Sequence, residues 1–402
     1  MRVLLIVDCY LPIPKSAAVM IHELGVELAH RGHDVIVAAP DANLVAPNRI
    51  TIEDGLTVLR VRIGQTKGTN KIIRAVNEVR LSSVIWKAGK KFFRTNPCDL
   101  IVFYSPTIFF GRLVQRLKEM WNCKAYLILR DIFPQWTLDV GVLRKGPAYW
   151  FFRSKELKQY SVADIIGVES PANLKYFSKN GLQDKCHLEV LYNWTALSGK
   201  KIVLRNYRRQ LGLRDKVVFF YGGNIGTAQD MDNIVRLAKN LSEHAGIHFL
   251  LVGQGSEVPR LKAKIRKSEL KNISIHPSLP QAQYLGMLSQ CDVGLISLDR
   301  ALKTCNIPGK ILAYMYLSMP ILASVNPCND LKRILENSRA GLVCTNGQDE
   351  QLCNYALLLA KDVGLRWQMG HNARKVLEDT FCVSRAASQI LSHIKDLPID
   401  SK

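Results

Sequence analysis

Residues 304–324 combine a short loop, a lysine and an apolar run in a way that suits phosphate binding. Pro308 and Gly309 predict the start of a helix, because the missing N–H of proline would be unpaired in the first turn anyway. The N–H groups of Gly309, Lys310 and Ile311 would then point out of the helix end. Together with the Lys310 ammonium they would bind an anion such as a phosphate. The alternative is an ordinary strand–helix connection with an exposed lysine.

Two glycine-rich turns also suit an anion site in the second half of the chain. Glycine lets the backbone approach a ligand closely and leaves N–H groups available. The spacing matches neither the Gly-x-Gly-x-x-Gly fingerprint nor a P-loop, so neither an NAD enzyme nor an NTPase is indicated. The plain alternative is a pair of ordinary strand–helix turns. The residues concerned are Gly222, Gly223 and Asn224 in the first turn and Gly253 and Gln254 in the second.

Polar residues follow two predicted strands in the first half of the chain. Lys15, Ser16 and Ala17 come after a proline-containing loop, where Ser16 is expected to cap a helix and the small alanine leaves room for a ligand. Arg130 and Asp131 directly follow another apolar run. A charged pair in this position indicates a site more strongly than a surface ion pair.

Other catalytic groupings find little support in the sequence. The ten cysteines contain no Cys-x-x-Cys pair, which indicates free thiols in a reducing compartment and argues against a zinc site. Five histidines lie in or beside predicted elements without a visible carboxylate or serine partner, so a hydrolase triad is not supported. These histidines are His22, His30, His33, His248 and His276.

The elements that must position these residues alternate between strand and helix, twice along the chain. This pattern predicts an α/β protein of two doubly wound, Rossmann-like domains facing a cleft. A length of 402 residues also favours two domains. We expect domains at 1–196 and 217–375, a polar linker at 197–216, and a C-terminal helix at 376–402 that packs back towards the first domain. The predicted strands are Val3–Val7, Val35–Ala39, Leu100–Phe103, Ala125–Leu129, Ile165–Val168, Val217–Tyr221, His248–Val252, Ile273–His276, Val293–Ile296 and Ile321–Ala323.

The formal charge of +21 indicates an anionic partner. No zinc-finger, RNA-recognition or basic-zipper pattern is present, so nucleic-acid binding would rest on charge alone and is not expected. Basic residues alternate with bulky apolar ones in residues 67–94 and again in 144–155. This pattern suits contact with an anionic membrane surface, although helices with solvated lysines would look similar. No apolar run approaches a membrane span, so we expect a cytoplasmic, peripheral protein.

Several of these strings together resemble the GT-B glycosyltransferases of family 4. They include Gly-Asn-Ile-Gly at 223–226, Val-Gly-Gln-Gly-Ser at 252–256 and Pro-Gly-Lys-x-x-x-Tyr at 308–314. Ser-Ala-Ala at 16–18 and Arg-Asp-Ile-Phe-Pro-Gln-Trp at 130–136 resemble, more closely, bacterial O-antigen and capsule transferases that add N-acetyl-L-fucosamine. The resemblance runs the full length of the chain.

The resemblance implies a retaining transferase without a bound metal or cofactor. It would move a sugar from a nucleoside-diphosphate sugar, UDP by analogy, to a polyprenyl-pyrophosphate-linked saccharide at the inner face of the bacterial inner membrane, in O-antigen, lipopolysaccharide or capsular polysaccharide biosynthesis. Arg130 stands where many members have a histidine, and a guanidinium cannot act as a base, so Arg130 is assigned to phosphate or substrate binding. The implied catalytic residues are Arg130, Asp131 and Lys310. The implied acceptor-binding residues are Lys15, Ser16 and Ala17. The implied donor-binding residues are Gly222, Gly223, Asn224, Gly253, Gln254, Pro277, Ser278, Leu279, Pro308, Gly309, Lys310 and Ile311, with the base near residues 277–279.

Cys305 and Ala313 depart from the family pattern, which often has glutamates at these positions, the second of which holds the nucleotide ribose. Neither side chain can act as a carboxylate, so ribose contact must come from elsewhere. Two alternatives therefore stay open. One is a catalytically silent GT-B subunit that binds a partner transferase. The other is a GT-B sugar-nucleotide epimerase, which would need carboxylates converging on the sugar.

Overall fold

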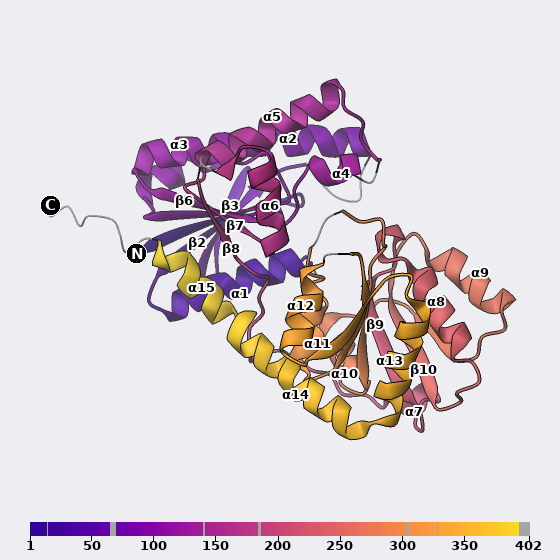
Figure 1. Ribbon diagram of the computed structural model, residues 1–402. Helices are drawn as coiled ribbons and strands as arrows, with labels where there is room; N and C mark the ends of the chain where they lie inside the picture. The colour runs from indigo at the N-terminus through magenta and orange to yellow at the C-terminus, as the bar shows by residue number, and fades with distance from the viewer. Residues whose placement is uncertain are drawn as a thin grey trace. The chain divides into compact units, whose positions relative to one another are not determined.

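The computed structural model divides into two compact units (Figure 1). Unit 1 comprises residues 1–195 and the chain from 383 onward, and unit 2 comprises residues 196–382. The structure describes residues 1–13, 15–64, 70–139, 141–183, 186–303, 306–327 and 329–393.

Unit 1 is built on one mainly parallel sheet. Across the sheet the strands are β3 (Asn48–Glu53), β4 (Leu56–Arg62), β2 (Asp34–Asp41), β1 (Arg2–Ile6), β5 (Leu100–Tyr104), β6 (Lys124–Leu129), β7 (Ile165–Val168) and β8 (His187–Val190). Only the β3–β4 pair is antiparallel among the pairs of the described sheet. Strands are added on both sides of β1, so the sheet is doubly wound and its order reverses between β1 and β5.

Helices cover both faces of the unit 1 sheet (Figure 1). The helices are α1 (Ser16–His30), α2 (Lys71–Thr95), α3 (Gly111–Trp121), α4 (Gln135–Asp139), α5 (Pro147–Val162), α6 (Pro171–Lys179) and the C-terminal α15 (Val383–Ser392). Apolar residues of α2, α3 and α5 join one strand face in a single core. On the other side α15 packs against α1, where the Arg31 guanidinium donates to the Ser384 carbonyl at 2.6 Å.

Unit 2 has a fully parallel sheet in the order of a dinucleotide-binding fold. Its strands are β11 (Ile273–His276), β10 (Ile247–Gln254), β9 (Val217–Asn224), β12 (Val293–Ser297), β13 (Ile321–Val325) and β14 (Gly341–Thr345). Its helices are α7 (Tyr207–Gln210), α8 (Met231–Asn240), α9 (Val258–Lys267), α10 (Gln281–Leu288), α11 (Ile311–Tyr316), α12 (Asp330–Asn337), α13 (Asp349–Lys361) and α14 (Val363–Thr380). The order reverses between β9 and β12, and open α/β sheets bind ligands at the carboxyl ends of the strands beside such a point.

The structure confirms the predicted class of two doubly wound halves, and each predicted strand is present. Residues 197–216, expected as a linker, lie within unit 2. Within this segment the Val203 N–H donates to the Ala282 carbonyl at 2.9 Å, and Arg208 pairs with Asp292. The expected C-terminal helix at 376–402 starts inside α14 and continues as the separate helix α15, and residues 394–402 lie outside the described part of the chain.

Candidate functional site

The ends of β9 and β10 bring the two predicted glycine turns together. In the parallel register Gly223 lies opposite Gly253, and Asn224 lies opposite Gln254. A Cβ atom added at Gly253 would lie 1.8 Å from the Gly223 carbonyl oxygen. Only glycine therefore allows this close approach of the two backbones. Gly222 directly precedes Gly223 at the end of β9.

Lys310 reaches the same strand end from the loop after β12. Its Nζ atom lies 3.7 Å from the centroid of the Tyr221 ring. A Cβ atom added at Gly223 would lie 3.8 Å from Lys310 Cε. Because β9 and β12 are neighbours at the reversal of strand order, residues far apart in the sequence meet here.

The surroundings of Lys310 disfavour its charged form unless an anion lies nearby. Burial lowers the pKa of the Lys310 ammonium to about 7. Among the residues that the structure describes, Lys310 makes a cation–π contact with Tyr221 and no ion pair. A negatively charged ligand beside Nζ would restore the charged form. The position therefore suits an anion.

The helix that follows Lys310 begins later than the sequence predicts. It starts at Ile311, and Lys310 occupies the N-cap position. The Ile311 N–H donates to the Pro308 carbonyl at 3.1 Å. The sequence analysis assigned this N–H to a phosphate, but in the structure it closes a turn. The predicted helix start at Pro308 and Gly309 is wrong. These two residues form a turn in front of a short helix.

Tyr314, the last residue of the Pro-Gly-Lys-x-x-x-Tyr string, fixes α11 to the sheet. The side chain is fully buried. Its hydroxyl accepts a hydrogen bond from the Gly222 N–H at 3.2 Å and lies 3.1 Å from the Leu295 carbonyl oxygen. The string thus holds the Lys310 loop against β9 and β12.

Residues 277–279 follow β11 at the same edge of the unit 2 sheet. Pro277 and Ser278 are exposed and Leu279 is half-buried. The Ser278 hydroxyl donates to the Gln254 side-chain oxygen at 3.3 Å. The structure therefore brings this predicted segment next to the β10 turn.

In unit 1, the predicted pair Arg130 and Asp131 follows β6. Arg130 is buried, and its guanidinium donates to the Leu191 and Tyr192 carbonyls at 2.5 and 3.3 Å. It also lies over the Trp194 ring, 5.3 Å from the centroid. In this structure Arg130 holds the chain after β8 against the sheet.

Glu169 is a candidate site residue that the sequence analysis missed. It directly follows β7, and burial raises its pKa to about 8, although the charge of Arg130 opposes the shift. Burial also raises the pKa of Asp131, and the charge of Asp8 adds to this effect. The side-chain carboxyl groups of Glu169 and Asp131 thus lie close to the Arg130 guanidinium, where the parallel strands end. The rule that identified Arg130, a polar residue straight after a buried strand, would also have found Glu169.

Lys15, Ser16 and Ala17 lie where α1 begins. Ser16 is the first helical residue and Lys15 takes the N-cap position, with no side-chain capping bond. The expected capping role of Ser16 is therefore wrong. Lys15 and Ser16 are exposed and Ala17 is half-buried, so a ligand can reach the first two side chains.

His22 has the carboxylate partner that the sequence did not reveal. Its Nδ1 lies 2.8 Å from the Tyr10 hydroxyl and its Nε2 lies 3.1 Å from Asp54 Oδ2. The expectation of no carboxylate or serine partner is wrong for His22, and also for His248, whose Nε2 lies 2.8 Å from Ser274 Oγ. Tyr10 is only 1% exposed, so this group fixes α1 to its neighbours and offers no accessible nucleophile.

The two segments expected at a membrane carry exposed apolar side chains. On α2 these include Ile73 and Val76, and on α5 they are Trp150 and Phe151. Residues 67–69 lie outside the described part of the chain. No helix among the described residues has the length and hydropathy needed to cross a bilayer. The described cysteines are free thiols.

Comparison with known proteins gives a consistent result. Residues 204–376 match the family model "Glycosyl transferases group 1". The chain is 28% identical over 287 residues to "Probable glycosyltransferase WbjE" of Pseudomonas aeruginosa, covering 69% of this chain and 68% of the relative. It is 22% identical over 316 residues to "Putative colanic acid biosynthesis glycosyl transferase WcaI" of Escherichia coli K12, covering 74% of each.

Solved structures share the fold over the full length. A sucrose-phosphate synthase from Thermosynechococcus elongatus superimposes with a TM-score of 0.74 at 16% identity, covering 100% of both chains. HepE of Anabaena, crystallised with UDP, gives a TM-score of 0.70 at 14% identity and covers 99% of this chain and 100% of its own.

Proposed function

We propose that the chain is a group 1 glycosyltransferase that transfers a sugar from a UDP-sugar to a lipid-linked saccharide during polysaccharide synthesis. The position of Lys310 carries this proposal. The half-buried Lys310 side chain lies beside the Gly223 backbone at the strand-order reversal of unit 2, where open α/β sheets bind ligands.

The donor diphosphate would occupy the surroundings of Lys310, Gly223 and Gly253. Glycine backbones and one cation supply short, charge-assisted contacts to phosphate oxygens. The base would lie near Ser278, whose hydroxyl already contacts Gln254. The crystal structure of HepE with UDP, a protein of the same fold, supports UDP as the nucleotide.

The proposed reaction retains the configuration at the anomeric carbon. The bond from this carbon to the diphosphate oxygen breaks, and a bond to the acceptor oxygen forms on the same face. The acceptor proton passes to the departing phosphate. Lys310 stabilises the negative charge that builds up on that phosphate, and such electrostatic stabilisation is often the largest contribution to catalysis.

Unit 1 would bind the acceptor. Lys15, Ser16 and Ala17 offer an accessible helix start. We assign Arg130 to positioning, since its guanidinium already holds two backbone carbonyls. Asp131 would then be the charged group closest to substrate at the β6 end.

We propose N-acetyl-L-fucosamine as the sugar and a polyprenyl-pyrophosphate saccharide as the acceptor, at the inner face of the bacterial inner membrane. The strings at 16–18 and 130–136 support the sugar. The relative WcaI, a putative colanic acid biosynthesis glycosyl transferase, supports a polysaccharide as the product class. The exposed Trp150 and Phe151 on α5, near basic residues, support contact with anionic lipid.

A silent subunit is the second candidate, and Ala313 favours it. This residue belongs to α11, directly after the Lys310 loop, and its methyl group cannot bind a ribose hydroxyl. Cys305 lies outside the described residues. The sugar-nucleotide epimerase has less support, because the matching family model and both relatives are described as glycosyltransferases.

Nucleotide binding separates these candidates. We would record thermal shifts of the full chain with UDP, GDP, CDP, TDP, ADP and NAD. A rise with UDP and none with NAD is the expected result. No rise with any nucleotide would favour the silent subunit.

Turnover of UDP-sugars then tests the role of Lys310. Lys310→Ala should lower kcat at least about a hundredfold, the scale seen when one oxyanion donor is removed. Lys262→Ala, an exposed lysine on α9, is the matched control and should leave kcat unchanged. A wild-type rate for Lys310→Ala would exclude the proposed phosphate contact.

A further inference from the structure

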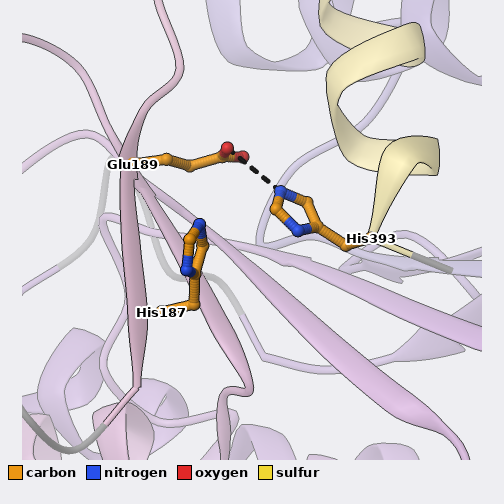
Figure 2. Close-up of side chains that lie close together, drawn as sticks. All are labelled: His187, Glu189 and His393. Carbon is orange, nitrogen blue, oxygen red and sulfur yellow. Dashed lines mark hydrogen bonds and ion pairs between the residues drawn. The ribbon is translucent and has the colours of Figure 1, made fainter. Parts of the chain in front are cut away.

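Two histidines and a glutamate meet where the last helix of the chain reaches the edge of the unit 1 sheet (Figure 2). His187 and Glu189 lie two positions apart on the edge strand β8, so both side chains stand on the same face. His393 directly follows α15. The three residues therefore come from the two separate chain segments that form unit 1.

The three side chains offer ligand atoms at short range. Glu189 Oε2 lies 3.0 Å from His393 Nε2. The rings of His187 and His393 have centroids 5.0 Å apart. One ligand atom from each residue falls within 4.8 Å of the other two. Tetrahedral zinc holds its ligand atoms about 3.3 Å apart, so a small rotation of the exposed His187 would complete the set.

A buried tyrosine already orients the Glu189 carboxylate. The Tyr126 hydroxyl, on β6, donates to Glu189 Oε1 at 2.5 Å. Strand β7 lies between β6 and β8, and its residue beside the Tyr126 hydroxyl is Gly167. A Cβ atom added at Gly167 would lie 2.4 Å from that hydroxyl. The missing side chain lets tyrosine reach across one strand. Oε1 is thus held by tyrosine, and Oε2 faces the histidines.

The backbone of His393 is fixed as well. Lys124 Nζ donates to the His393 carbonyl at 2.9 Å. The Gln389 side chain, on α15, donates to the Val190 carbonyl at the end of β8, also at 2.9 Å. Both bonds hold the end of α15 in place against the sheet, so the three candidate ligands are not brought together by one ion pair alone.

We propose that His187, Glu189 and His393 bind one Zn²⁺ ion, which links α15 to the edge of the unit 1 sheet. Two imidazoles and one carboxylate are a common zinc donor set and leave a fourth position for water. Imidazole favours zinc over Mg²⁺ and Ca²⁺, which take oxygen ligands. Outer-shell partners such as Tyr126 are typical of zinc sites. The proposal concerns unit 1 and does not rest on the proposed donor site.

Calorimetric titration of the metal-stripped, full-length protein with ZnCl₂ tests the proposal. The wild type should bind one equivalent, and zinc should raise its Tm because the ion binds the folded state. His187→Ala and Glu189→Gln should each lower the zinc affinity at least about tenfold and abolish the thermal shift. Tyr126→Phe should lower the affinity by about tenfold.

Two controls keep the result decisive. His244→Ala removes an exposed histidine in unit 2 and should bind zinc like the wild type. His187 is exposed, so His187→Ala should fold normally, which circular dichroism verifies. Absence of saturable binding, or undiminished binding by His187→Ala, would overturn the proposal and leave Glu189 and His393 as an ion pair.

Discussion

At the scale of single residues, the half-buried Lys310 side chain links donor binding to pH. Its pKa of about 7 in the free protein means that part of the population is neutral at neutral pH. A phosphate beside Nζ favours the charged form and raises the pKa. Binding therefore takes up a proton at pH values above 7, and the affinity must fall as the pH rises.

We predict that the affinity for UDP falls about tenfold between pH 7 and pH 8.5 in the wild type. Lys310→Arg should show a nearly flat profile over this range, because a guanidinium stays charged. Isothermal titration at several pH values, in buffers of different ionisation enthalpy, measures both the affinity and the proton uptake. A flat wild-type profile would show that Lys310 does not contact the phosphate.

Gly253 permits a second prediction at the same scale. A methyl group there would collide with the Gly223 carbonyl, so Gly253→Ala must move one of two paired strand ends. We expect a loss of about 1–3 kcal/mol in the free energy of unfolding, the usual cost of overpacking, together with loss of UDP binding. Gly246→Ala is the control, since an added Cβ meets no atom within 4 Å there. Chemical denaturation of both variants gives the comparison. Equal stabilities would argue against the close approach.

The positions of the candidate residues relative to the strands could be compared directly with the structure. The rule that candidate residues follow buried parallel strands indicated the two glycine turns and Arg130, and the structure places each at a strand end, whereas Lys310, predicted from the Pro-Gly-Lys string, lies directly before α11. The rule could not assign roles. Arg130 turns out to hold backbone carbonyls, and His22 meets Asp54 only through the folding of β3 and β4. Such partners depend on tertiary contacts that local sequence does not encode.

At the scale of elements, α11 is too short to be stable by itself and is held by Tyr314. Helices of a single turn or two gain their stability from packing. The Tyr314 hydroxyl satisfies the buried Gly222 N–H of β9 and lies near the Leu295 carbonyl of β12. One side chain thus connects the Lys310 loop to both strands at the reversal of order.

We predict that Tyr314→Phe destabilises the protein by about 1–3 kcal/mol, because the Gly222 N–H loses its buried partner. UDP affinity should fall as well, since the Lys310 loop loses its anchor. Tyr355→Phe, which alters a partly buried tyrosine on α13, is the matched control. Urea denaturation and UDP titration measure the two effects. If Tyr314→Phe lost stability but kept its UDP affinity, the position of α11 would not affect donor binding.

Element boundaries were predicted less well than element types. Most of the continuous apolar runs of the central strands were clear, but four strands were missed. Two of these, β3 and β8, are partly exposed edge strands with polar residues, whereas β4 and β14 are largely buried. The start of α11 was misplaced because proline at the first helical position is only a tendency. Here Pro308 closes a turn instead, and the hydrogen bond of Ile311 is formed within that turn.

At the scale of the whole molecule, the charge of +21 has to be considered together with its distribution. Surface charge alone raises the affinity for any polyanion. A specific membrane surface also needs exposed apolar side chains near the basic ones. On α2, Ile73 and Val76 are exposed in the same helix as Lys87, Lys90 and Lys91, which are exposed too.

We predict that Lys87→Glu, Lys90→Glu and Lys91→Glu together release the protein from vesicles that contain anionic lipid. Each lysine near an anionic surface contributes about 1 kcal/mol, so the triple reversal should weaken binding at least about a hundredfold at physiological salt. Co-sedimentation with phosphatidylcholine vesicles, with and without phosphatidylglycerol, measures the binding.

The matched control changes the total charge equally but in unit 2. Lys262, Arg266 and Lys267 on α9 are exposed, and their reversal to glutamate removes the same six charge units. If position decides binding, the α9 variant stays on the vesicles and the α2 variant leaves them. If total charge decides it, both variants leave to the same extent, because screened attraction to a polyanion does not depend on one helix. Equal loss would therefore argue against a membrane surface on α2 and leave a general attraction to polyanions.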